Sequence, residues 1–70
     1  MNGVDGLTRR RAQAMSRLPA VHAVALQLRE EGLTSQQIAE HLGIDPVAVS
    51  PLLAVAEAKL EAIMDEGAGD

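Results

Sequence analysis

The stretch of sequence that decides the fold is TSQQIAEHLGIDPVAVSPLLAVAEAKL, which occupies residues 34–60. Thr34 at its start is followed three residues later by Gln37, which is the spacing of a capping box. In a capping box each of the two side chains satisfies a free backbone N–H at a helix start. Apolar residues at helical spacing follow as far as Leu42, and Gly43 then suits the left-handed conformation that ends many helices. These signals predict a short helix between Thr34 and Gly43.

A second helix start follows almost directly after that glycine. Asp45 is a favourable N-cap, and Pro46 fits the first helical position, where its missing N–H is not needed. The apolar side chains that follow at helical spacing are Val49, Leu53, Ala56, Leu60 and Ile63. The pattern predicts a long helix that continues until Gly67.

Pro51 is an anomaly within this long helix. A proline in a helix interior removes one backbone hydrogen bond and clashes with the preceding turn. Ser50 and Pro51 also form a good pair of N-cap and first helical residue, so the helix either kinks or restarts there. The sequence leaves both alternatives open.

Two more helices are expected on the N-terminal side. Thr8 can cap a helix over residues 9–17, and Leu18 ends it, because the residue before a proline is pushed out of the helical region. Pro19 then suits the first position of a helix over residues 20–31. The apolar face of that helix consists of Val21, Val24, Ala25 and Leu28, and Gly32 is placed to end it.

These elements predict an all-α fold, namely a small domain of three to four helices with a helix-turn-helix core. The domain is expected to cover residues 8–66, with the helix-turn-helix motif at residues 34–60. Residues 1–7 contain two glycines and no apolar periodicity, so we expect a disordered lead there and a flexible tail at residues 67–70.

The composition of the 70-residue chain excludes most kinds of chemical site. It has no cysteine and no aromatic residue, and its two histidines are too few for a metal or catalytic cluster. We therefore expect no enzymatic activity, no cofactor, no metal site and no small-molecule substrate. Of its 33 apolar residues twelve are alanine, so the core is thin and oligomerisation is a usual remedy.

Charge is distributed unevenly along the chain. Residues 1–17 hold four arginines and one aspartate, for a net charge of +3, whereas residues 45–70 hold one lysine and six carboxylates, for a net charge of −5. The N-terminal residues lead into an arginine cluster, and no apolar run approaches the roughly 18 residues of a membrane span. We expect neither a signal peptide nor a membrane segment, and we place the chain in the cytoplasm.

The stretch LPAVHAVALQLREEGLTSQQIAEHLGIDPVAVSPLLAVAEAKL, residues 18–60, resembles the promoter-reading C-terminal domain of bacterial sigma factors. Quorum-response regulators have a similar pattern. The matching segments are Leu18-Pro19, Glu31-Gly32-Leu33-Thr34, Ile38-Ala39-Glu40, Leu42-Gly43-Ile44 and Val49, with the spacing to Leu53, Ala56 and Leu60. The resemblance covers 43 of the 70 residues and implies a protein of bacterial transcription regulation whose long helix lies in the major groove of DNA.

The outward face of that long helix departs from the family pattern. The family usually carries Lys or Arg near the positions of Ser50, Leu52 and Val55, and often near Glu57. On a helical projection, the side opposite the apolar stripe carries Val47, Ser50, Pro51, Ala54, Ala58 and Glu61. None of these side chains makes the bidentate base contacts that dominate direct readout, and the nearby carboxylates repel phosphate.

Two functions of different classes follow. The first is a transcription regulator that binds double-stranded DNA weakly, as a homodimer or with a larger protein of the transcription apparatus. Its candidate DNA contacts are Arg9, Arg10, Arg11, Gln36 and Ser50. The alternative is a protein-interaction module, an adaptor or anti-regulator, that keeps the fold without DNA binding. The candidate protein-interface residues are Val47, Leu52 and Val55, from the apolar surface of the long helix.

Overall fold

The computed structural model describes residues 3–68, and all regular secondary structure within that range is helical, with no strand. Its elements are α1 (Gly3–Met15), α2 (Ala20–Glu30), α3 (Ser35–Leu42), the 3₁₀ turn η1 (Pro46–Ala48) and α4 (Val49–Ala68). This arrangement confirms the expected all-α fold with a helix-turn-helix.

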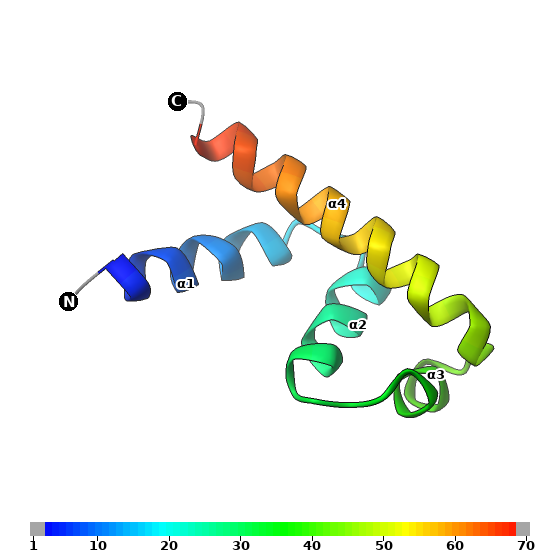
Figure 1. Cartoon of the computed structure of the whole chain (residues 1–70). Coiled ribbons are helices and arrows are strands. Elements are labelled where there is room, and N and C mark those ends of the chain that lie inside the picture. The colour runs from blue at the N-terminus through cyan, green and yellow to red at the C-terminus, as the bar shows by residue number, and fades with distance from the viewer. Residues whose placement is uncertain (1–2, 69–70) are drawn as a thin grey trace.

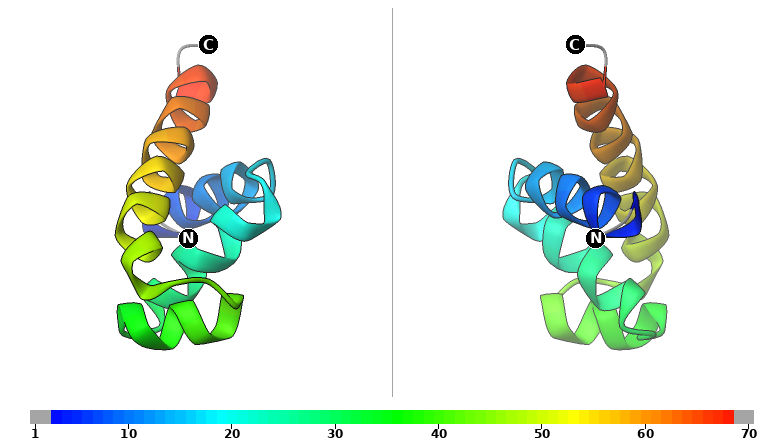
Figure 2. Two further views of the ribbon diagram at one scale, coloured as in Figure 1. Left: turned by 90° about the vertical axis from the view of Figure 1, so that its right-hand side faces the viewer. Right: turned by 90° about the vertical axis from the view of Figure 1, so that its left-hand side faces the viewer.

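The molecule is elongated, and α4 is the helix that contacts all the others. Helices α2 and α1 both pack against α4, and α3 packs against α2, η1 and the start of α4 (Figure 1). Figure 2 shows α3 at one end of the molecule, the C-terminal end of α4 at the other, and α1 between them. The core therefore lies between α2, α3 and the first half of α4, while α1 and the second half of α4 extend from it.

All four α-helices contribute to one apolar core. Its buried residues are Ala14, Leu18, Ala25, Leu26, Ile38, Ala39, Val49, Leu53, Ala56 and Leu60. The α4 residues among them follow the 3.6-residue period that the sequence predicted for one face of the long helix.

The predicted helix ends around α3 are confirmed. The Thr34 Oγ1 accepts a hydrogen bond from the backbone N–H of Gln37 at 3.2 Å, and the Gln37 Oε1 accepts one from the Thr34 N–H at 2.9 Å. Gly43 ends α3 with a φ of 72°, and Gly32, one residue past the C-cap of α2, has a φ of 96°. Glycine fits both positions because a Cβ atom disfavours positive φ.

The start of the last helix explains the anomalous proline. Asp45 caps η1 through a 2.9 Å hydrogen bond from the Val47 N–H to its carboxylate, with Pro46 at the first position. Because η1 precedes α4, Pro51 is only the third residue of α4, where backbone N–H groups have no partner within the helix. The proline therefore fits the first turn, and neither a kink nor a restart at Ser50 is needed.

Some predicted boundaries were wrong. α1 begins at Gly3, so Thr8 lies inside it and does not cap it. Residues 3–7 are thus helical rather than a disordered lead, since extending a formed helix is far easier than starting one, even through a glycine. At the other end, α4 continues through Ala68, into the segment that was expected to be a flexible tail. The rest of the expected lead and tail, residues 1–2 and 69–70, lies outside the described part of the chain.

The predicted apolar face of α2 was also only partly correct. Ala25 is fully buried as expected, but the second buried residue of α2 is Leu26, and Val21 is 43% exposed. Pro19 is the N-cap rather than the first helical residue, with an extended ψ of 146°. The tight turn that ends α1, closed by a 3.1 Å hydrogen bond from the Leu18 N–H to the Met15 carbonyl, sets this register.

Candidate functional site

The helix-turn-helix unit is formed by α3, the turn after Gly43 and the start of α4. The N–H of Ile44 donates to the carbonyl of Ala39 at 3.0 Å, which fixes the direction of the chain as it leaves α3. Ile38 of α3 and Val49 of α4 are both fully buried in the same core. Packing at these two residues sets the angle between the helices and leaves the opposite side of α4 at the surface.

The outward face of α4 lacks cations. Its exposed residues are those that the sequence placed there: Val47 just before the helix, then Ser50, Pro51, Ala54, Ala58 and Glu61. From Asp45 onward the sequence contains a single cation, Lys59, beside six carboxylates. Lys59 lines a small hollow with Leu18 and Pro19, on the side of α4 where α1 ends. The face that the fold presents therefore offers little to phosphate.

Two of the predicted DNA-contact residues lie on the helix-turn-helix itself. Gln36 is the second residue of α3 and Ser50 is the second residue of α4, and both are exposed. Polar side chains at helix starts commonly meet phosphate oxygens, although the Gln37 N–H is already taken by Thr34 and the Val49 N–H donates to the Pro46 carbonyl.

The three predicted arginines lie elsewhere, on α1. Arg9 and Arg10 are exposed, whereas Arg11 is partly buried and its guanidinium pairs with the carboxylate of Glu30 on α2. Since α1 packs against the second half of α4, these cations lie apart from the first turn of α4 (Figure 1). The structure thus does not bring the five candidate DNA contacts together in one surface.

An apolar groove of about 410 Å³ lies between the start of α2 and the start of α4. It is lined by Val21, His22, Ile44, Ala48, Pro51, Leu52 and Val55. Two of the predicted interface residues, Leu52 and Val55, are in this set. The third, Val47, does not line the groove but is 81% exposed.

Sequence reasoning missed the side of this groove that α2 provides. Val21 was assigned to the core, and His22 carried no functional signal. The His22 Nδ1 is buried, and within the described residues it has no hydrogen-bond partner. Because α2 and α4 are far apart in the sequence, no local pattern joins these two residues with Leu52 and Val55.

Comparison with known proteins identifies the family. The profile described as sigma-70, region 4 matches residues 9–60, which is most of the chain. The chain belongs to the sigma-70 region 4 family. No curated protein and no solved structure matches it.

Membership in the sigma-70 region 4 family shows which class of domain the helix-turn-helix belongs to. The family consists of non-enzymatic DNA-binding domains of the transcription machinery. Within residues 3–68, no three His, Asp or Glu side chains are grouped so that they could hold a metal ion, and no helix there is long and apolar enough to cross a bilayer. The family match ends at Leu60, so the last two turns of α4 lie beyond it.

Proposed function

We propose that this sigma-70 region 4 domain regulates transcription through weak DNA contact that needs a second unit, either another copy or a larger protein of the transcription apparatus. The observation that carries the proposal is the exposed face of α4, where neither an arginine nor a lysine stands among the six outward residues. Neutralisation of phosphates supplies most of the affinity of a DNA-binding protein. A single copy with this helix therefore binds weakly.

The DNA contact we propose has two parts. Gln36 and Ser50 meet the duplex at the starts of α3 and α4, and Arg9 and Arg10 supply phosphate contacts from α1. Arg11 contributes less, because its guanidinium is already paired with Glu30. Neither part alone has the charge of an ordinary DNA-binding domain, which is why a second unit is required.

A salt series tests this proposal. Fluorescence anisotropy with labelled duplex DNA should show an affinity that falls with salt with a log–log slope of roughly −2 to −3, since each phosphate contact contributes about −0.9. The double variant Arg9→Gln/Arg10→Gln should reduce the slope by about 2. Lys59→Gln is the matched control, because Lys59 lines the hollow beside Leu18 and Pro19 and is not on the outward face of α4. No measurable binding at low salt would reject DNA contact by the chain.

A second candidate function is a protein-interaction module, an adaptor or anti-regulator without DNA binding. The groove favours it, because seven residues of α2, the turn, η1 and α4 line a shallow apolar hollow beside a valine that is 81% exposed. Isolated apolar side chains at the surface are common, whereas apolar side chains gathered from several elements suit contact with a partner.

Purified bacterial RNA polymerase core enzyme, immobilised for interferometry, is the probe for this second function. Leu52→Glu and Val55→Glu should each abolish binding, because a carboxylate would be buried in an apolar contact. Ala54→Glu adds the same charge on the exposed face of α4 outside the groove and should leave binding unchanged. Polymerase binding that needs the groove, together with no DNA binding at low salt, would favour the module over the DNA-binding regulator.

A further inference from the structure

We infer that the cleft between α1 and the second half of α4 is a self-association surface, which receives the acidic side of α4 from a second copy of the chain. The inference deepens the proposed function, since it names the second unit. Its test measures the oligomeric state alone, so it can fail without affecting the DNA proposal.

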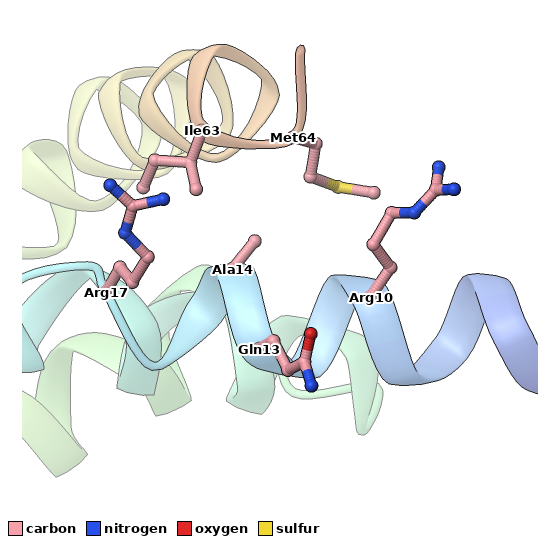
Figure 3. A pocket seen from close by; sticks show the side chains of 6 residues that line it. All are labelled: Arg10, Gln13, Ala14, Arg17, Ile63 and Met64. Atoms are coloured by element: carbon pink, nitrogen blue, oxygen red, sulfur yellow. The ribbon is translucent and has the colours of Figure 1, made fainter. Parts of the chain in front are cut away.

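The cleft has an apolar floor between two arginines. It measures about 160 Å³ and is lined by Arg10, Gln13, Ala14, Arg17, Ile63 and Met64. Figure 3 shows Arg10 and Arg17 rising from α1 at the two ends of the cleft, with Ile63 and Met64 opposite Ala14. Such a site fits a helix whose two outer carboxylates meet the arginines and whose central carboxylate meets the Gln13 amide.

The second half of α4 has few neighbours within its own chain. The buried residues of α4 end at Leu60, and among its described side chains beyond that point, residues 61–66, Ile63 and Met64 alone are partly buried, against α1. In Figure 1 this part of α4 and the N-terminal part of α1 diverge from the core. Helices with few neighbours bury little apolar surface, and short helices depend on packing for their stability. Two more helices, from a second copy of the chain, would supply the missing packing.

The chain itself carries the complementary charge. Glu57, Glu61 and Asp65 are exposed and follow one another at four-residue intervals, so they form one acidic stripe along α4. Glu57 and Asp65 are about 12 Å apart along the helix axis, and Arg10 and Arg17 are about 10.5 Å apart along theirs. The two spacings are close enough for an acidic stripe to lie along the arginine pair.

Small residues beside the acidic stripe allow close approach. Ala54, Ala58 and Ala62 are exposed and lie next to the stripe on the helical projection. The distance between packed helices depends on the side chains at the contact, so alanines let a second helix come near. The stripe with its alanines therefore fits the cleft of a partner copy.

The arginines of α1 already attract carboxylates within one chain. Arg11 pairs with Glu30, and the Arg17 guanidinium lies 3.9 Å from the carboxylate of Glu66. The Arg17–Glu66 pair is 62% and 69% exposed, and such an exposed pair contributes little to stability. Arg17 can therefore exchange this carboxylate for one from a second copy at little cost.

Both halves of the contact are present on every copy, which is the requirement for a two-fold dimer. The cleft of one copy takes the acidic stripe of the other, and the same contact repeats across the axis. The helix-turn-helix lies at the other end of α4 and stays uncovered (Figure 2). In the dimer Arg10 faces carboxylates of the partner copy instead of phosphate, so each of the two units contacts DNA through Gln36, Ser50 and Arg9.

Charge reversal tests the inference by sedimentation equilibrium at micromolar protein concentrations, with far-UV circular dichroism to check folding. The unchanged chain should dimerise. The double variants Arg10→Glu/Arg17→Glu and Glu57→Lys/Asp65→Lys should each raise the dimer dissociation constant by at least about tenfold, because each change occurs twice in a symmetric dimer and replaces attraction by repulsion. Arg9→Glu is the matched control, since Arg9 lies on α1 but does not line the cleft.

Mixing the two variants separates a lost contact from a damaged fold. The cleft variant and the stripe variant, each impaired alone, should form a mixed dimer, because one contact then keeps its native charges and the other has both signs reversed. A monomer for the unchanged chain at these concentrations would overturn the inference. So would a dimer that both charge reversals leave intact while Leu52→Glu dissociates it, because the groove would then be the contact.

Discussion

Leu26 is the residue on which the packing of α2 depends, and its replacement by alanine tests the register of that helix. Its side chain is 2% exposed and is among the largest that are completely enclosed. The apolar pattern of the sequence favoured Val21 instead, which the structure leaves 43% exposed. Substituting each residue by alanine therefore distinguishes the two registers by free energy of unfolding.

The expected difference is large compared with the stability of the domain. A buried leucine replaced by alanine costs about 3 kcal/mol, from lost transfer energy and the cavity that remains. A 70-residue domain has a total of roughly 3.5–10 kcal/mol, so Leu26→Ala should lower Tm by about 12–24 °C or leave the chain largely unfolded. Val21→Ala removes half-exposed methyl groups worth about 0.8 kcal/mol, and the better helix propensity of alanine returns up to about 0.5 kcal/mol.

Thermal and urea unfolding followed by far-UV circular dichroism measures both variants. Each melt should be repeated over about a hundredfold range of protein concentration, since self-association raises apparent stability by mass action. Equal losses for Val21→Ala and Leu26→Ala, or a larger loss for Val21→Ala, would refute the register. A Leu26→Ala cost below about 1 kcal/mol would refute the role of Leu26 as a packing centre.

Three further predictions concern the helix ends and use the same melts. Thr34→Ala removes the side chain that accepts from the Gln37 N–H, so it should cost about 1 kcal/mol, and Thr34→Ser should restore most of it. Gly43→Ala should cost about 1 kcal/mol through its φ of 72° alone, because no atom lies within 4 Å of the added Cβ; a cost near zero would contradict this. Pro51→Ala should change stability by less than about 1 kcal/mol, whereas a gain near 3 kcal/mol would mean that the proline disrupts α4 after all.

The features predicted correctly from sequence are those that a few adjacent residues determine. The capping box at Thr34, the glycine at residue 43 and the Asp45–Pro46 start each depend on contacts within four residues, and all three are present. The face of α2 was harder, because its apolar residues surround much of the helix and only packing against α4 selects Leu26. The role of Pro51 was also undecided from sequence, since the 3₁₀ turn before α4 shifts it into the first helical turn.

The candidate sites also divide into residues that the pattern of one helix reveals and residues that only the folded structure brings together. Leu52 and Val55 could be found from one helix, because both are apolar where the family expects charge. Val21 and His22 could not, since only the packing of α2 beside α4 brings them to the same groove. The cleft could not be predicted from the sequence for the same reason, because Arg10 and Met64 are far apart in the sequence and meet only where α1 crosses α4.

The proposed dimer also gives a reason for the length and the charge of α4. Ser50 and Glu61 are eleven residues apart, which is about 16 Å along the helix. The proposed contact lies in the C-terminal half of α4, so Ser50 of each copy stays well clear of it. The acidic half of α4 contributes nothing to DNA contact in one chain, but in the dimer it joins two helix-turn-helix units. Weak contact at each helix can then suffice, because the second contact forms within the same complex.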